Sequence, residues 1–461
     1  MTSSMHRKSA IILALSFVLL APIHAQEEER PGERSGDGGP FRERSANEIV
    51  TFEPQTFAAD SGLVRVDVLY RIRYDFFVFT HDYSAGPQTY RAHGNILIEL
   101  IDSTETSVSR KVSSINLHAS NNELLQLRKQ YYQGSASLLV QPGRLTAVYR
   151  VEDEETRREF GDRKQILRIP SFKGNSSLRS TLTFVDPPAD PSTSSRFVPL
   201  NNGNTALFAL NTGVILSVSD EDISPTVRYS LVQVNSEGRE RSLVQKETTV
   251  VASIFRRTSL RLDADNPEDL RYVLDSSAKT TAMYFTLPTS HLKQGRYTAR
   301  FHFGSHDTSS ISKDFSIRWI DMPLSLWDLD FAISAMKYIA TDDEFDELRS
   351  GSRASRIRKF EEFWGKRDKT PETAYNEVMA EYFRRVDYAF TTFKTLKEEN
   401  GAMTDRGRIH ILFGKPSNII RSLAPGAPPR EVWTYSSLNK EFIFEDPSKQ
   451  GNYKLIESES K

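Results

Sequence analysis

The chain contains GRLTAVYRV at residues 143–151 and a related stretch, GRYTARFHF, at residues 295–303. Both stretches begin with Gly-Arg, share a Thr-Ala pair and carry an apolar side chain at alternate positions. Alternation with a period of two is typical of a strand that turns one face to the protein core. A second match sets Gly62-Leu63-Val64 against Gly213-Val214-Ile215 at nearly the same offset. Two such matches indicate a duplicated β module; the alternative is that strands after a glycine turn generally look alike.

Strand patterns surround these stretches. Apolar residues alternate from Val64 to Tyr74, and strand-like runs follow at 95–101 and 137–140. The offset between the copies exceeds the period of solenoid or propeller repeats. The sequence therefore predicts two all-β, immunoglobulin-like sandwich modules.

The chain changes character after about residue 319, and all four tryptophans lie from there on. Apolar residues recur every three or four positions between 375 and 393, which predicts a long amphipathic helix opening at Thr370-Pro371. A shorter helix is expected around 357–364, and residues 325–328 and 341–344 resemble capping boxes. Gly401 is expected to end the long helix. Strands are expected at 408–413, 431–435, 441–445 and 453–456, so the C-terminal part is an α+β unit with helices first and a small antiparallel sheet last.

The N-terminus has the features of a secretory signal. A basic start is followed by a short apolar run, Ala10 to Pro22, and charge resumes after Ala25. The run is too short to span a bilayer, so we expect export and cleavage near Ala25. An uncleaved N-terminal anchor is the alternative. The expected location is the periplasm, or an extracellular or outer-membrane-associated site.

The predicted organisation has five parts. These are a signal peptide at 1–25, a disordered linker at 26–48, sandwich modules at 49–185 and 186–320, and the α+β domain at 321–461. The linker is rich in Glu, Arg, Gly and Ser, and such a composition cannot bury a core.

Composition excludes several classes of chemistry. The chain has no cysteine, which removes disulfides, thiol nucleophiles, cysteine-bound metals and a lipid-anchor cysteine. The net charge of −1 gives no global field for nucleic acid. The sequence contains no nucleophile elbow and no phosphate-binding glycine loop. We expect no cofactor, no nucleic-acid partner, and neither a membrane span nor a lipid anchor in the mature chain.

The segment GAMTDRGRI at 401–409 concentrates polar side chains behind the predicted long helix. Thr404 and Asp405 suit a local turn, and Arg406 and Arg408 can pair with nearby carboxylates. The favoured interpretation is structural. The alternative is that Asp405, Arg406, Arg408 and Lys415 recognise a carboxylate, a phosphate or a partner peptide. A catalytic Asp405 is disfavoured because no second acid or base is fixed beside it.

An ordered series of short blocks identifies a family resemblance. The blocks are FEEFW at 360–364, RD at 367–368, TP at 370–371, NE at 376–377, GAMTDRGRI at 401–409, FGKP at 413–416 and EVW-x-Y at 431–435. From about Ser325 to Ser458 the chain resembles GWxTD domain proteins, exported bacterial proteins without an established reaction, cofactor or ligand. The tryptophan of the naming motif is Ala402 here.

Metal binding has only weak candidates. Asp263, Asp265 and Asp269 alternate as calcium ligands do, but the segment lacks the glycine and spaced glutamate of an EF-hand loop. A solvated turn is favoured there. His302 and His306 are interpreted as surface histidines, because zinc requires three or four converging ligands.

The leading hypothesis is a non-catalytic exported cell-envelope protein. Its sandwich modules and C-terminal domain would make protein or glycan contacts with an unknown envelope partner. The alternative is a hydrolase acting on an envelope polymer, with its site in the C-terminal domain.

Overall fold

A computed structural model describes residues 49–460, apart from 87, 128–129, 174–176, 220–222, 236–238, 264–269, 277–279 and 304–308. The predicted signal peptide and linker lie outside the described residues. No helix among the described residues has both the length and the apolar character needed to cross a membrane.

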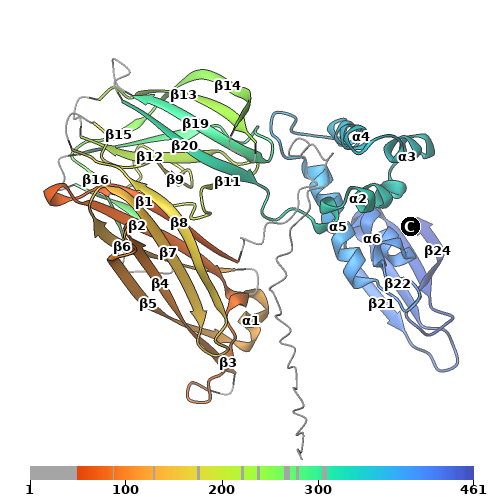
Figure 1. Cartoon of the computed structure of the whole chain (residues 1–461). Helices are drawn as coiled ribbons and strands as arrows, with labels where there is room; N and C mark the ends of the chain where they lie inside the picture. The colour runs from red at the N-terminus through yellow and green to blue at the C-terminus, as the bar shows by residue number, and fades with distance from the viewer. Residues whose placement is uncertain are drawn as a thin grey trace, which may run out of the picture. The chain divides into compact units, whose positions relative to one another are not determined.

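The first set of strands forms two sheets around one core. One sheet has the order β1-β2-β6, and the other has the order β3-β4-β7-β8 with β5 paired to β4 (Figure 1). Phe52 of the first sheet stacks on Tyr149 of the second, with ring centroids 4.2 Å apart. The elements are β1 (Val50–Ala58), β2 (Val64–Arg73), β3 (Thr80–His81), β4 (Thr89–Ile101), β5 (Ser107–Ser120), α1 (Asn121–Leu127), β6 (Tyr131–Val140), β7 (Gly143–Asp153) and β8 (Glu159–Ile169).

The second set again forms two large sheets, β9-β12-β18-β15 and β11-β20-β19-β13-β14, with a small third sheet β10-β17-β16. Its strands are β9 (Thr183–Val185), β10 (Arg196–Phe197), β11 (Thr205–Leu207), β12 (Thr212–Val218), β13 (Thr226–Val234), β14 (Glu240–Val251), β15 (Ser253–Phe255), β16 (Ser259–Leu262), β17 (Tyr272–Asp275), β18 (Thr281–Leu287), β19 (Gly295–Phe303) and β20 (Ser309–Arg318).

The two sets share their strand order. In the first, the hairpins β4-β5 and β7-β8 meet through β4 and β7. In the second, β13-β14 and β19-β20 meet through β13 and β19. The repeated stretches of the sequence are β7 and β19, which therefore occupy equivalent central positions. This agreement supports the predicted duplication, while the predicted domain boundaries stay predictions.

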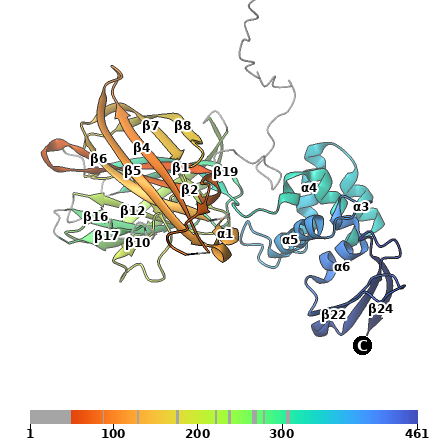
Figure 2. The ribbon, with the colours of Figure 1, turned by 90° about the horizontal axis from the view of Figure 1, so that it is seen from below.

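The C-terminal part is helical first and ends in a four-stranded antiparallel sheet of order β21-β22-β23-β24, as predicted. Figures 1 and 2 show α5 and α6 beside one another near this sheet, and inward side chains such as Trp433 and Phe444 share their core. The elements are α2 (Leu329–Ala335), α3 (Asp342–Arg349), α4 (Arg353–Gly365), α5 (Glu377–Thr392), α6 (Asp405–Phe413), β21 (Asn418–Ser422), β22 (Arg430–Tyr435), β23 (Lys440–Glu445) and β24 (Lys454–Ser460).

Three local expectations are wrong. The long helix begins at Glu377, because the Asn376 side chain accepts from the Met379 N–H and caps it there. It ends at Thr392, so Gly401 belongs to a separate 3-10 turn, Gly401–Met403. The predicted strand at 408–413 is helix α6. The capping box at Thr341 and Glu344 is confirmed, and its side chains exchange both hydrogen bonds.

Candidate functional site

The turn at 400–404 is held tightly against the end of α5. The Asn400 side chain accepts from the Ala402 N–H, and the Thr404 hydroxyl donates to the Gly401 carbonyl at 2.8 Å. Thr404 also caps α6 by accepting from the Gly407 N–H at 3.0 Å. A Cβ on Gly401 would lie 2.3 Å from the Ala389 carbonyl oxygen, so only glycine fits this approach. The motif is thus a compact joint between two helices.

Asp405 and Arg406 bind the sheet rather than each other. Asp405 Oδ2 accepts from the Leu455 N–H at 3.0 Å, which attaches the start of α6 to β24. The Arg406 guanidinium lies 3.5 Å from Glu431 Oε2 and 4.2 Å from the centroid of the Tyr453 ring. Both residues therefore serve the contact between α6 and the sheet.

Glu431 is a buried carboxylate at the centre of this contact, with a side chain 5% exposed. It accepts from the Trp433 indole N–H at 3.0 Å and from Arg421 Nε at 3.0 Å, in addition to facing Arg406. Burying a carboxylate is costly unless it is paired and hydrogen-bonded, and here both conditions hold. Glu431 was not among the site residues predicted from the sequence. Its inward position, two residues before Trp433 on a strand, was the available signal.

Arg408 and Lys415 do not join this cluster. Arg408 Nε is buried without an acceptor among the described residues. Its positive charge favours the ionised Tyr338 phenol, yet burial dominates and raises the pKa of Tyr338 to about 12. Lys415 is exposed, just beyond the end of α6. Asp405 and Arg406 thus lie at the contact between α6 and the sheet, whereas Arg408 and Lys415 lie elsewhere.

The calcium candidate finds no support in the described residues. Asp263 forms an ion pair with Arg271 at 2.8 Å, and a carboxylate already engaged by a guanidinium is a poor calcium ligand. Asp265, Asp269 and His306 lie outside the described residues. Across the part of the chain that is described, no three His, Asp or Glu side chains gather as a metal site would require.

A cavity of about 490 Å³ lies between the loop after α2, the end of α4, α5 and the end of α6. Its apolar lining comprises Ile339, Trp364, Val378, Tyr382, Ile411 and Leu412. Its charged lining comprises Arg367, Lys369, Glu377, Glu381 and Arg385. An apolar floor with a few polar groups, at this size, is typical of a ligand pocket.

Most charges around the cavity have partners. Arg385 Nε donates to Glu381 at 2.7 Å, and Glu377 accepts from the Thr370 hydroxyl at 2.8 Å. Arg367 lies 3.4 Å from Glu344 and sits over the Phe363 ring at 3.5 Å. The Trp364 indole N–H, by contrast, has no acceptor among the described residues, although the side chain is 2% exposed. An unpaired buried donor costs free energy, so this N–H lowers the stability of the folded domain.

Residues 325–460 match the family model described as the GWxTD domain. The chain carries a GWxTD domain. The resemblance drawn from the sequence is confirmed, and the GWxTD domain contains the turn, the Glu431 cluster and the cavity. At the position of the naming tryptophan, Ala402 is fully buried and its carbonyl accepts from the Tyr338 hydroxyl at 2.9 Å.

Other comparisons give only distant likenesses. Comparison with curated proteins gave no match. Among solved structures, red sea bream transglutaminase is 9% identical with a TM-score of 0.15, over 58% of this chain and 31% of that one. The C-terminal domain of the Streptococcus pyogenes antigen I/II-family protein AspA is 6% identical with a TM-score of 0.15, over 59% and 99% of the two chains. The Streptococcus agalactiae BspA C-terminal domain is 9% identical with a TM-score of 0.13, over 58% and 100%. The chain spans about a third of the transglutaminase. TM-scores this low do not establish a shared fold or function with any of these proteins.

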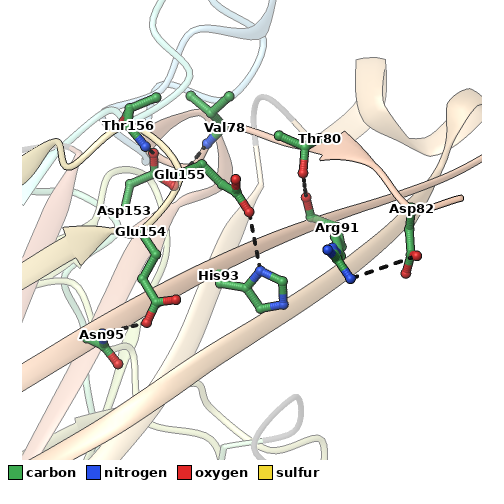
Figure 3. Close-up of polar contacts among 10 residues, drawn as sticks. All are labelled: Val78, Thr80, Asp82, Arg91, His93, Asn95, Asp153, Glu154, Glu155 and Thr156. Atoms are coloured by element: carbon green, nitrogen blue, oxygen red, sulfur yellow. Dashed lines mark hydrogen bonds and ion pairs between the residues drawn. The ribbon is translucent and has the colours of Figure 1, made fainter. Parts of the chain in front are cut away.

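A polar row outside the GWxTD domain runs along the first part of β4 (Figure 3). Arg91 lies 3.9 Å from Asp82, His93 lies 3.4 Å from Glu155, and Asn95 donates to Glu154 at 2.6 Å. The buried Asp153 accepts from the backbone N–H groups of Val78 and Thr156. His93 and Asn95 thus fasten the β7–β8 turn to β4, whereas Arg91 faces Asp82 in the loop after β3. We assign this polar row a structural role.

Proposed function

We propose that the chain is a non-catalytic exported cell-envelope protein whose GWxTD domain binds an apolar, carboxylate-bearing peptide segment. The observation that carries this proposal is the apolar cavity beside α5, with the Trp364 side chain in its lining. Export is supported by the signal-like N-terminus of the sequence.

The lining of the cavity supports the choice of ligand. Its apolar floor suits aliphatic or aromatic side chains. Arg367, Lys369 and Arg385 outnumber the two glutamates at the rim, and both glutamates are already engaged by Thr370 and Arg385. Arg385 is paired with Glu381 and Arg367 faces Glu344, so Lys369 supplies the further positive charge that favours a carboxylate on the ligand.

The two β modules are proposed to be immunoglobulin-like sandwiches that make protein or glycan contacts. The support is their strand order, with a three-stranded sheet β1-β2-β6 facing a sheet built from the hairpins β4-β5 and β7-β8. The repetition of this order in the second set favours one module type used twice.

Calorimetric titration with a defined pair of probes tests the pocket. The probes are acetyl-Leu-Leu-Phe as the free acid and as the amide. We expect saturable binding of the acid and weaker binding of the amide. Val378→Phe, which fills the floor of the cavity, should abolish both, while Val251→Phe, at a position 78% exposed, should change neither.

The charge of the rim is tested in the same titration. Lys369→Glu should weaken binding of the acid about tenfold, or about 1.4 kcal/mol, and leave the amide nearly unchanged. Lys397→Glu, an exposed lysine outside the cavity lining, is the matched control. Failure of both probes to bind, or binding indifferent to Val378→Phe, would refute the proposal.

Hydrolysis of an envelope polymer has one observation in its favour. Glu377 and Glu381 lie one helical turn apart on α5 beside the cavity, and paired carboxylates perform general acid–base chemistry. Both are exposed and hydrogen-bonded elsewhere, which favours binding. Incubation with purified peptidoglycan distinguishes the hydrolase from the non-catalytic binding protein. Soluble fragments that are released by the natural chain, but by neither Glu377→Gln nor Glu381→Gln, would replace the binding proposal with the hydrolase.

A further inference from the structure

Strand β21 (Asn418–Ser422) is an edge strand whose five side chains are all exposed. Within the described residues it pairs with β22 alone, in an unbroken antiparallel register. Ile419 is 40% exposed and Ile420 is 57% exposed. Natural edge strands are commonly protected by lysine, proline or a bulge, and β21 contains none of these. The single charged side chain of β21 is that of Arg421, and its Nε donates to Glu431 Oε1 on β22 at 3.0 Å.

An apolar row on the outer face of the sheet ends at this edge. Trp433 on β22 points inward, so the neighbouring Val432 points outward. Val432 pairs with Ile420 on one side and with Ile443 on the other. Residues directly opposite in a sheet share a face, so Ile443, Val432 and Ile420 form one continuous row. The row stops where β21 has no further partner strand.

We propose that β21 pairs with β21 of a second copy of this chain, antiparallel and with Ile420 opposite its own counterpart. A second copy fits this edge because the register continues the apolar row through six residues on six neighbouring strands, Ile443, Val432 and Ile420 from each copy. Centring the pair on Arg421 would set like charges directly opposite, which is destabilising, and centring it on Ile419 would set Ile420 against Asn418. The two-fold arrangement presents the same surface from each copy and closes on itself, so it yields a dimer rather than a fibre.

Site-directed cross-linking tests the register, since the chain contains no cysteine. Opposite Cα atoms of an antiparallel pair lie about 4.5–5.5 Å apart, within the range that a disulfide spans. The mature Ile420→Cys variant should therefore form a dimer of twice the chain mass under mild oxidation. Asn418→Cys lies on the same edge but would be about 13 Å from its counterpart, at roughly 3.3 Å per residue, and should cross-link poorly. Ile456→Cys, half exposed on β24 of the same sheet, should also remain monomeric.

Analytical ultracentrifugation tests the assembly without a cross-link. The natural chain should sediment as a dimer at micromolar concentration. Ile420→Lys sets two lysines opposite each other and should raise the dissociation constant at least about tenfold. Ile456→Lys is the matched control and should leave the dimer intact, and urea unfolding of each variant checks that it folds. A monomeric natural chain, a dimer unaffected by Ile420→Lys, or equal cross-linking at residues 418, 420 and 456 would each overturn the proposal.

Discussion

Because Gly401 has no side chain, the turn before α6 can pack directly against the backbone at the end of α5. The position of its absent Cβ is surrounded by backbone, with the Ala389 carbonyl at 2.3 Å and the Phe390 carbonyl at 2.8 Å. Backbone cannot rotate away as a flexible side chain can, so an added methyl group must push two elements apart. The sequence marked Gly401 as a helix end, whereas the structure shows that close packing requires it.

Gly401→Ala is expected to destabilise the chain by about 2–3 kcal/mol, because overpacking forces the backbone to shift. Urea unfolding measures the change. Gly365→Ala is the control, since nothing lies within 4 Å of a methyl group added there. We expect that variant to differ from the natural chain by less than about 1 kcal/mol. Equal effects of the two substitutions would argue against the tight joint.

His410 is a buried histidine on α6 that stacks on Tyr388 with ring centroids 4.5 Å apart. Burial lowers its pKa from 6.5 to about 4. The nearby Arg385 acts in the same direction, and Glu381 opposes it. The imidazole is therefore neutral in the folded chain at neutral pH.

The lowered pKa of His410 predicts a loss of stability in acid. Between pH 6.5 and about 4 the unfolded chain binds a proton at this position that the folded chain resists. The stabilisation is thus complete above pH 6.5 and decreases as the pH falls toward 4. Urea midpoints at pH 7, 5.5 and 4.5 should decrease more steeply for the natural chain than for His410→Phe, which cannot titrate. Parallel pH profiles would show that His410 does not contribute.

The residue pattern of helix α6 explains why the sequence predicted a strand there. Ile409 and Ile411 alternate with Arg408 and His410, which imitates the period of two. In the structure Gly407, Ile409, His410 and Ile411 are all buried, so the helix is covered on several sides. A helix without an exposed face has no period of 3.6 in its sequence. The cap at Thr404 was the available signal for a helix start.

Thr404→Ala is expected to cost about 1–2 kcal/mol, because it removes the acceptor for the Gly407 N–H and the donor to the Gly401 carbonyl. Thr404→Ser keeps the hydroxyl and should recover most of that loss. Ser352→Ala removes a simpler cap, a 3.3 Å bond at the start of α4, and should cost less. Thermal unfolding of the three variants measures these differences. A Thr404→Ser variant as unstable as Thr404→Ala would show that the hydroxyl is not the cause.

At the scale of the whole molecule, the repeated strand order accounts for the repeated sequence. Stretches 143–151 and 295–303 are the central strands β7 and β19, each paired on both sides. A central strand of a sandwich keeps an alternating pattern because one face lies in the core. Edge strands carry weaker constraints, so the sequence match is strongest where the sheet is most enclosed.

The proposed export of the chain can be tested on the whole molecule. We expect the chain isolated from the cell envelope to begin at Gln26, because the basic start and short apolar run are the features of a cleaved signal. Intact mass and N-terminal sequencing measure this. A chain that keeps residues 1–25 and sediments with membranes would favour the N-terminal anchor instead.

Local sequence patterns predicted the class of each part and the family of the C-terminal domain. Alternation and repetition are local properties, and they were sufficient to predict β modules followed by an α+β unit. The contacts between side chains, in contrast, depend on how the elements pack together. The four site candidates are neighbours in sequence, Asp405, Arg406, Arg408 and Lys415. Asp405 nevertheless binds β24, whereas Arg406 faces Glu431 of β22. The cavity likewise combines residues from 339 to 412, because it forms where the faces of several helices leave space. Contacts between distant segments depend on how helices and strands pack against each other. The local pattern of apolar and polar residues does not specify that packing.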